Sequence, residues 1–580
     1  MLRKFVIVAA FAALVAVAAA SAAPGSQRRS SQESSSTTTL MPGVTYTRAV
    51  DFTSRGPIVI DVVTAPKPDG SVYSLGPVVS NGTLRGTDKL THLERQMAGS
   101  GTTVAIDGDY FDRRTGAPSG IVFQGGVLES QPVAGRSSLG IGTDGTLTAA
   151  RVAFAGAWQG NGQRRPLFLN TPKGRFTLYT PAYGNATPGE SGAVEAVIGS
   201  FPQGRLDQPL DGTVNQVANG GPTRIPPGGA VLVARGALAT SQLRAEAPVG
   251  QQVDARLSLS PDWSDQAGAI GGGPLLVKNG KPVFHANESF APSVLNHRQA
   301  RGAVGQLADG RILLVSVEGT NPAYSIGMSS YELAVELSRL GARTAYGLDS
   351  GAAAGMAFDG RLLTRPSSGR EAKLSDALAL TYSGVYALPP SAAVLSPNGD
   401  GIGDTEALSF RVVRPSDVSA VLTGPRGVEI TLVNGAVQPG PHSVAWDGRT
   451  AGTPAPEGQW TFAVTATDDR NVKTTAQRSF SLDDTLSSLT VSTSRGRATA
   501  SFRLARAARV VVRVERRTGS PVATLLSGQR ASGPQRVTWK GRIGRHPAPA
   551  GRYQLAVQSV SSVGASSLTA PFSFRPHTRH

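Results

Sequence analysis

The 580-residue chain contains no cysteine. This absence excludes disulfide bonds, thiol catalysis, thiolate metal sites and a lipid-modified N-terminal cysteine, and it suits an exported protein of a bacterium. Aromatic residues are also scarce, at 6%, whereas 69 glycines and 39 prolines favour many short strands and turns over long helices. A chain of this length exceeds one hydrophobic core, so we expect about three domains.

Long apolar runs are nearly missing as well. Arg3 and Lys4 precede an apolar run at residues 5–20, and Ala20-Ser21-Ala22 follows, which is the pattern of a secretory signal peptide over residues 1–23. No later stretch is apolar for the roughly 18 residues that a membrane span needs, so we expect a secreted or cell-surface bacterial protein without a span. The Ser-, Thr- and Gln-rich residues 24–43 predict a flexible linker.

Acidic residues are almost absent from the C-terminal end. Residues 486–580 hold sixteen Arg or Lys and one acid, Glu515, so this segment carries +15 of the net charge of +17. A partner bound by charge, such as an anionic cell-wall or capsule polymer, would meet this end, although a solvated face of a structural module explains the arginines equally well. Nucleic acid is disfavoured because few aromatic residues are interleaved with the arginines.

Three carboxylates follow a short apolar segment in AIDGDYFD, residues 105–112. The preceding TTVAI predicts a buried strand, so Asp107, Asp109 and Asp112 lie just past its end. One interpretation is an Asp-rich turn that caps its own backbone. The other is a functional loop, in which the Asp-x-Asp spacing of Asp107 and Asp109 suits calcium or another divalent cation.

Two further predicted strands end in an acid. Residues 311–317 predict a strand before Glu318, SSYE at 329–332 predicts a helix with a capping box, and residues 344–348 predict a strand before Asp349. This succession predicts a parallel pair with a right-handed crossover, which places Glu318 and Asp349 at one sheet edge. Upstream we expect paired strands at 57–65 and 71–80 and a helix capped by Thr87, and downstream of the Asp loop a β-rich insertion through about residue 259.

Two segments suggest anion binding. Gly271, Gly272 and Gly273 follow an apolar residue, and their N–H groups either hold an anion or simply form a tight turn. Further on, His297, Arg298 and Arg301 supply an imidazole and two guanidinium groups, which suit a phosphorylated substrate. Either arginine could instead pair with one of the acids.

Five segments, in order, resemble signatures of the phosphodiester glycosidase family, whose members include the enzyme that removes N-acetylglucosamine from mannose 6-phosphate diesters and bacterial relatives associated with exopolysaccharide. The segments are DGDYF (107–111), IGGGP (270–274), NHRQARGAVG (296–305), LDSGAAAG (348–355) and TRPSSGR (364–370). The resemblance spans about residues 44–384. It implies an α+β, mixed-sheet domain that cleaves the glycosidic bond of a sugar 1-phosphodiester.

The resemblance also implies roles for individual residues. Asp349 or Glu318 would be the base or nucleophile, with Asp107 and Asp109 positioning the sugar or holding a cation. Phosphate and substrate contacts would come from His297, Arg298, Arg301, Gly271, Gly272, Gly273, Tyr110 and Ser350. The chain departs from the family where Asp107 and Asp109 replace Asn and Gly, and where Ser350 and Ala352–Ala354 replace most of a glycine- and serine-rich loop. These departures imply an altered substrate, an altered metal requirement or lost activity.

The C-terminal third predicts two all-β modules, residues 390–484 and 486–576. Residues 442–468 align with residues 535–561, since both carry V-x-W-x-G-R and then P-A-P-x-G. The modules resemble the immunoglobulin-like domain of flagellar hook-capping proteins, with Trp446 and Trp539 as core anchors. Asn398, Asp400 and Asp404 alternate with glycines as calcium ligands do, and an Asx-rich turn fits them as well.

The sequence as a whole predicts a monomeric, exported phosphodiester glycosidase with an α+β body at residues 44–385, followed by two β-sandwiches. Its partner would be a phosphorylated carbohydrate or an anionic wall or capsule polymer. The alternative is a non-catalytic surface protein that binds polysaccharide through a degenerate glycosidase domain. Turnover of a sugar 1-phosphodiester would distinguish a hydrolase from a binding protein.

Overall fold

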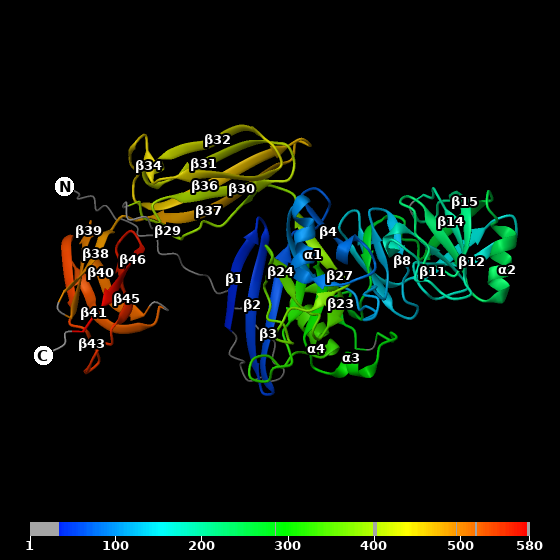
Figure 1. The fold of residues 1–580 in the computed structure, drawn as a ribbon, viewed down its shortest axis with the longest axis horizontal. Helices are drawn as coiled ribbons and strands as arrows, with labels where there is room; N and C mark the ends of the chain where they lie inside the picture. The colour runs from blue at the N-terminus through cyan, green and yellow to red at the C-terminus, as the bar shows by residue number, and fades with distance from the viewer. Residues whose placement is uncertain are drawn as a thin grey trace, which may run out of the picture.

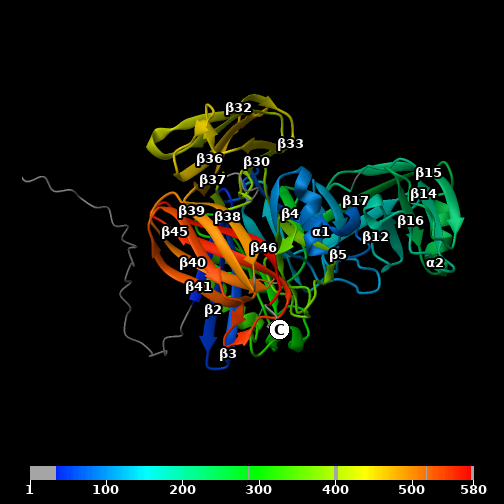
Figure 2. The same ribbon diagram turned by 60° about the vertical axis from the view of Figure 1, so that its left-hand side comes forward.

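The computed structural model describes residues 34–202, 204–284, 286–397, 403–494, 496–516 and 519–576. A layered body occupies the middle of the molecule, a barrel projects from one end, and two sandwiches lie at the other end (Figure 1). The second sandwich, in orange and red, lies beside the first, in yellow (Figure 2). The predicted signal peptide, and Asn398 and Asp400 of the predicted calcium loop, lie outside the described residues.

An eight-stranded sheet forms the centre of the body, with strand order β1-β2-β3-β22-β21-β23-β19-β20. Its strands are β1 (Ser34–Met41), β2 (Val44–Thr53), β3 (Gly56–Ala65), β22 (Ile312–Val317), β21 (Arg301–Leu307), β23 (Ala342–Ser350), β19 (Leu275–Lys278) and β20 (Lys281–Pro282). Every neighbouring pair is antiparallel. The ends of β22 and β23 and the start of β21 therefore meet at one edge of the sheet.

Two helices and a second sheet complete four layers. Helix α4 (Ser330–Arg339) covers one face of the central sheet through a core that includes Val315, Leu333 and Leu337. The other face packs on a five-stranded sheet, whose strands are β25 (Arg361–Leu362), β24 (Met356–Phe358), β6 (Thr102–Asp107), β27 (Asp376–Tyr382) and β4 (Tyr73–Val79). Helix α1 (Leu90–Gln96) covers the far side of that second sheet. The predicted capping box of α4 is confirmed, with Ser329 and Glu332 each accepting a backbone N–H of the other.

Several expectations for the body need correction. The strands predicted to pair at 57–65 and 71–80 belong to different sheets, because β3 pairs with β2 and β22 while β4 pairs with β27. The predicted parallel pair is split, since β21 lies between β22 and β23 and binds both. Part of the predicted linker is strand β1, which pairs with β2. Helix α1 has Lys89, not Thr87, at its N-cap and no side-chain cap.

The predicted β-rich insertion is a closed barrel seated on a small sheet. The barrel order is β11-β12-β13-β16-β14-β15-β17, with β12 and β13 parallel. Its strands are β11 (Ala153–Gln159), β12 (Arg165–Leu169), β13 (Phe176–Tyr179), β14 (Val194–Ile198), β15 (Leu210–Asn219), β16 (Ala230–Ala234) and β17 (Gln252–Ser260), and helix α2 (Ala237–Glu246) packs on them. The supporting sheet contains β10 (Leu147–Arg151), β9 (Ser137–Gly142), β18 (Gln266–Ile270), β7 (Val122–Gln124) and β8 (Val127–Ser130). The α+β class with mixed pairing is thus confirmed.

Each C-terminal module is a pair of packed sheets. The first combines β28 (Tyr386–Ala387), β30 (Glu406–Val412) and β33 (Gly440–Trp446) with β29 (Val394–Leu395), β37 (Lys473–Leu482), β36 (Gly458–Asp468), β31 (Ser416–Thr423) and β32 (Glu429–Val437). The second combines β38 (Leu486–Ser494), β39 (Arg497–Leu504) and β42 (Gly533–Trp539) with β41 (Pro521–Arg530), β40 (Ala508–Arg516), β45 (Gly551–Val560) and β46 (Ala565–Phe574). Trp446 and Trp539 are buried in the two cores, as predicted. Their likeness to hook-capping modules stays a prediction.

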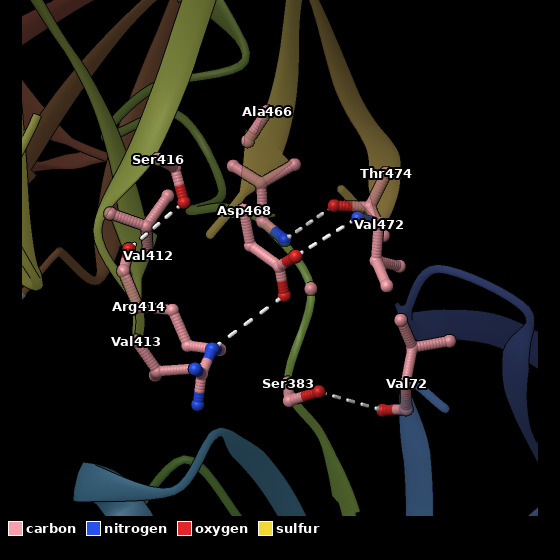
Figure 3. A pocket seen from close by; sticks show the side chains of 12 residues that line it. Val72, Ser383, Val412, Val413, Arg414, Ser416, Ala466, Asp468, Val472 and Thr474 are labelled. Carbon is pink, nitrogen blue, oxygen red and sulfur yellow. Dashed lines mark hydrogen bonds and ion pairs between the residues drawn. The ribbon is translucent and has the colours of Figure 1, made fainter. Parts of the chain in front are cut away.

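The first sandwich is bonded directly to the body. Val385, in the segment that leads out of the body, donates its N–H to Thr474 Oγ1 of β37 at 3.0 Å. Beside it, the Ser383 hydroxyl donates to Val72 O of the body at 3.4 Å (Figure 3). Arg411 of β30 donates to Thr102 Oγ1 at 2.7 Å. The cavity at this junction measures about 10 Å³, which is room for one water molecule. Within the described residues no helix is long and apolar enough to cross a membrane.

Candidate active site

Four aspartates gather between the two sheets of the body. Asp107 ends β6, Asp109 follows in the loop, Asp349 lies near the end of β23 and Asp376 begins β27. Their relative exposures are 0%, 3%, 8% and 0%, so Asp349 is the most accessible of the four. The loop joins the sheets directly, because Asp349 N–H donates to Gly108 O at 2.8 Å. The predicted juxtaposition of the Asp loop with Asp349 is therefore present, and Asp112 lies outside it as an exposed turn cap that accepts the N–H of Arg114.

Glycines make room for three of these carboxylates. A Cβ placed on Gly302 would lie 2.3 Å from Asp107 Oδ2, and one on Gly271 would lie 2.3 Å from Asp109 Oδ2. A Cβ on Gly108 would lie 2.4 Å from Asp376 Oδ1. Real Cβ atoms do not approach oxygen so closely, so each glycine is needed for close packing. The glycines of the IGGGP and RGAVG segments thus form the walls of an acid cluster.

Backbone amides hold the four side chains in place. Asp107 Oδ1 accepts from Gly355 N at 3.0 Å, Asp376 Oδ1 from Asp109 N at 2.8 Å, and Asp349 Oδ1 from Ser350 N at 2.6 Å. Asp109 Oδ2 accepts from Gly120 N. The second oxygens of Asp107 and Asp376 are buried and have no hydrogen-bond partner in the described residues. A buried oxygen without a donor favours the protonated carboxyl, because an isolated charge there is costly.

Burial accordingly raises the pKa of all four carboxyls. The pKa of Asp349 rises to about 7, with a further rise from the Asp109 carboxylate and an opposing effect from Arg113. The pKa of Asp109 also rises to about 7, against lowering by the Gly120 amide and by Arg136. For Asp107 and Asp376, burial and the neighbouring acids raise the pKa well above the usual range. Near neutral pH Asp109 and Asp349 can therefore change their protonation state, as acid–base catalysis requires.

An aromatic and cationic rim surrounds the accessible side of the cluster. The Arg136 guanidinium lies 4.2 Å from the ring centroid of Phe290 and 5.7 Å from that of Tyr110, and its Nε donates to Ser289 O. Tyr110 Oη is buried next to Ser350, which lowers the Tyr110 pKa through a side-chain hydrogen bond. Burial and the Asp349 carboxylate raise the pKa of Tyr110 to about 12, which keeps its proton available for donation. Ser350 is half-buried at the same rim and accepts from Gln299 Nε2 at 3.0 Å.

The two arginines predicted to bind phosphate contact other groups of the protein in the structure. Arg298 pairs with Glu332 at the start of α4, which explains its position without a ligand. Arg301 is buried, and its Nε and Nη2 donate to backbone carbonyls of Met328, Val294 and His297. It thereby fixes helix α3 (Pro292–Asn296), while Nη1 makes no hydrogen bond with the described residues. The His297 side chain is exposed, and only its carbonyl takes part in this contact.

Two of the three predicted anion-binding amides are already occupied. Gly271 N–H donates to Ile121 O at 2.9 Å, and Gly273 N–H donates to Gly347 O at 2.8 Å. These bonds fix the turn between β18 and β19, so only the Gly272 amide keeps the predicted phosphate role. The reason for the triple glycine is steric, because Gly271 faces Asp109 and Gly273 faces Phe290.

Glu318 belongs to a second acidic group beside the four aspartates. Its Oε1 accepts from Arg48 Nη1 at 3.0 Å and from Arg365 N at 2.8 Å, and the same Arg48 atom binds Asp61 at 2.9 Å. Burial, and then the nearby Glu318, raise the pKa of Asp61 to about 7 against the lowering by Arg48 and Tyr46. Glu318 lies at the predicted sheet edge, but these partners favour Asp349 over Glu318 as the base or nucleophile.

The acid cluster does not fit the predicted cation site. Calcium takes six to eight oxygen ligands, as a rule, whereas Asp107 and Asp109 each give one oxygen to a backbone amide. No three acids or histidines in the described ranges converge as metal ligands would. The predicted calcium loop of Asn398, Asp400 and Asp404 stays a prediction, because Asn398 and Asp400 lie outside the described ranges.

Sequence reasoning missed Asp376, Arg113 and Arg136. Asp376 opens the apolar run DALALTY, where an acid at the first position of a buried strand was an available signal. Arg113 directly follows the Asp loop, and its exposed side chain lowers the pKa of Asp349. Arg136 stands in a hairpin-like segment far from the loop in sequence, so only the fold brings it to Tyr110.

Comparison with known proteins agrees with this geometry in part of the chain. Residues 210–381 match the family model described as phosphodiester glycosidase, a stretch that includes Asp349 and Asp376 but not the Asp107 loop. The SPbeta prophage-derived uncharacterized protein YomE of Bacillus subtilis (strain 168) is 30% identical over 107 residues, which is 18% of this chain and 16% of that relative. The chain thus matches about a sixth of that protein's length, given the 16% coverage.

Two solved structures share the fold of the body. A hypothetical protein from Synechocystis has a TM-score of 0.50 at 25% identity, over 59% of this chain and 62% of its own. A protein of Burkholderia pseudomallei K96243, titled "Putative exported protein", has a TM-score of 0.50 at 16% identity, over 61% of this chain and 97% of its own. The chain therefore carries, at residues 210–381, a domain that matches the phosphodiester glycosidase family, within a body whose fold recurs in bacterial proteins.

Proposed function

We propose that this chain is an exported hydrolase that cleaves the glycosidic bond of a sugar 1-phosphodiester in a phosphorylated surface or extracellular carbohydrate. The observation that carries the proposal is Asp349, a carboxyl with a pKa raised to about 7, at the accessible side of a buried acid cluster. The match of residues 210–381 to the phosphodiester glycosidase model supports this class of reaction. The N-terminal signal pattern supports export.

The chemistry of the bond fits such a site. A phosphomonoester leaves readily from an anomeric carbon, so strong acid catalysis matters less than in an ordinary glycosidase. The site has to neutralise the phosphate, stabilise the positive anomeric centre and activate water or attack directly. An ionised Asp349 provides the carboxylate for the last two tasks.

The remaining residues divide the supporting tasks. Arg113 and Arg136, which lower the pKa of Asp349 and Asp109 respectively, supply positive charge for the phosphate at the rim. The Tyr110 hydroxyl, which lies beside Ser350, donates to a substrate oxygen. Asp107, Asp109 and Asp376 act as positioning residues that set the protonation of Asp349.

The direct test is release of free sugar from a panel of sugar 1-phosphodiesters by the full chain. We expect turnover of at least one phosphodiester and much slower turnover of the matching glycoside with a neutral aglycone, because the rim is cationic. Addition of a chelator should leave the rate unchanged, since the acids do not form a metal site. Absence of turnover for every sugar and aglycone, combined with retained glycan binding, would instead support the binding-protein alternative.

Loss of the rim charge should weaken substrate binding more than catalysis. We expect Arg113→Ser to raise KM for a phosphodiester by about tenfold, which corresponds to roughly 1.4 kcal/mol of lost attraction. It should also move the pH profile of kcat/KM upward, since Arg113 lowers the pKa of Asp349. Arg114→Ser is the matched control, because Arg114 is the exposed neighbour in the same loop. Equal effects of both variants would show that Arg113 has no specific contact with substrate.

A further inference from the structure

The outer face of one sheet in the second sandwich is basic and carries no acid. Strands β38, β39 and β42 contain no Asp or Glu. Their outward positions carry Ser and Thr side chains together with four exposed cations, Arg497, Arg503, Arg536 and, directly after β42, Lys540. None of these four makes a hydrogen bond or ion pair with another described residue. We call this surface the basic face.

The first sandwich provides an internal comparison. The S-F-R of β30 corresponds to the S-F-R of β39, and Arg411 pairs across the sheet with Pro441 as Arg503 does with Pro534. Arg411 contacts the body, where its guanidinium donates to Thr102 Oγ1. Its counterpart Arg503 has no such neighbour. This face therefore packs against the body in the first sandwich, whereas the equivalent face of the second sandwich is exposed.

The repeat also differs at the positions that add charge. Arg536 corresponds to Ser443, and Lys540 corresponds to Asp447, in the aligned segments QRVTWK and HSVAWD. The inward residues of the two segments are alike, since both tryptophans are buried. Packing therefore does not require Arg536 and Lys540. These two cations are surface features particular to the second module.

The basic face has the shape for an extended ligand. A shallow hollow of about 500 Å³ occupies one part of it, lined by Ser488, Ser501, Phe502, Arg503, Pro534, Gln535 and Arg536. Arg497 and Arg503 stand six residues apart on β39, about 20 Å at the usual rise per residue. Cations spread over that length match a chain with repeated negative charges better than a single small anion.

The side chains of the basic face favour one class of polyanion over others. Its aromatic residues point inward, because Phe502 and Trp539 are buried, so there is no exposed ring on which a nucleobase could stack. It also presents no large apolar side chain for a lipid surface. Hydroxyl groups between the cations, among them Thr499 and Thr538, suit the hydroxyls of a polyol or sugar backbone.

We propose that the basic face binds an extended, phosphate-bearing sugar or polyol polymer and thereby holds the hydrolase on it. This surface lies on a separate module from the acid cluster. Binding to it therefore does not depend on the proposed catalytic function. If the chain has both functions, the polymer bound at the basic face also contains the bond that the acid cluster cleaves.

The test compares two full-length variants that lose equal charge. One changes the basic face to serine at Arg497, Arg503, Arg536 and Lys540. The control changes four arginines of the opposite sheet to serine, on β40 and β45, namely Arg509, Arg513, Arg516 and Arg552. Affinity is measured for poly(glycerol phosphate), with single-stranded DNA and phosphatidylglycerol vesicles as competing probes, and hydrolysis of a small phosphodiester is measured in parallel.

We expect the face variant to bind poly(glycerol phosphate) at least about tenfold more weakly at low salt, with little change in the control variant. Binding of the unaltered chain should disappear at about 1 M salt, where the Debye length is about 3 Å. Turnover of the small substrate should be the same in both variants. Equal weakening in both variants would overturn the assignment to this face, and tighter binding of DNA or vesicles would overturn the choice of ligand.

If the proposed hydrolysis fails while the face variant still loses polymer binding, the binding inference stands and the catalytic proposal falls. If hydrolysis succeeds while neither variant affects polymer binding, the reverse holds. The two proposals thus fail separately.

Discussion

Asp349→Asn should lower kcat for a sugar 1-phosphodiester by a factor on the order of a thousand or more, with a small effect on KM. The asparagine has the shape of the aspartate and retains the oxygen that accepts from Ser350 N at 2.6 Å. It lacks the charge that stabilises the anomeric centre and the basicity that activates water. The loss should therefore appear in the chemical step and not in folding.

The pH dependence of the same reaction gives an independent check. Asp349 must be ionised to act as a base or nucleophile, and burial raises its pKa to about 7. In the unaltered enzyme kcat/KM should therefore rise with pH through about 7 and fall away in acid. Because the four aspartates interact, the measured value belongs to the cluster. Residual activity of Asp349→Asn should lack this rise.

Two companion variants sharpen the assignment. Asp112→Asn changes an exposed aspartate of the same loop to the same residue and should keep nearly full activity. Glu318→Gln tests the alternative base in the Arg48 group. A large loss of kcat with Glu318→Gln and a minor loss with Asp349→Asn would reverse the assignment.

Gly302→Ala should be strongly destabilising although it adds only one methyl group. The new Cβ would lie 2.3 Å from the buried Asp107 carboxylate, at a position without positive φ, so the cost is purely a collision. Neither partner can move easily, since Gly302 is in β21 and Asp107 ends β6. We expect a loss of about 1–3 kcal/mol in the free energy of unfolding of the body, from overpacking. Calorimetry of the full chain, following the transition of the body, measures it.

Gly305→Ala on the same strand is the matched control. Its Cβ would meet Ala342, Thr344 and Ala345 at 3.4 to 3.5 Å, which is ordinary contact, so the change should be small. Asp107→Ala should partly rescue Gly302→Ala by removing the carboxylate. A double-mutant cycle without positive coupling between Gly302 and Asp107 would contradict the close packing.

The sequence predicted the local elements of the site better than their partners. The strand before Asp107, the capping box of α4 and the strand before Asp349 are confirmed, because each depends on residues close in sequence. Which strands pair was not predictable from these patterns. The insertion of β21 between β22 and β23, and the placement of β4 beside β27, depend on contacts between residues far apart in the chain.

The same limit explains why the contacts of some site residues were not predicted and why other site residues were missed. Arg298 and Arg301 carry the charge expected of phosphate ligands, but Glu332 and the carbonyls at the end of α3 bind them. A sequence shows that an arginine is present and does not show which acceptor lies nearest. Asp376 and Arg136 were missed for the complementary reason, because their neighbours in sequence carry no motif.

The seating of the barrel has a consequence for how relatives of this protein can differ. β11 starts at Ala153 opposite Ser260, where β17 ends, so the chain enters and leaves the barrel side by side. The far loops can therefore lengthen, shorten or be exchanged without altering the body. The end of the barrel nearest the body cannot change in this way. Its core contains Ile121, whose carbonyl accepts the N–H of Gly271 in the wall of the acid cluster. Insertions and deletions among relatives should accordingly accumulate in the far loops of the barrel, with its foundation held constant.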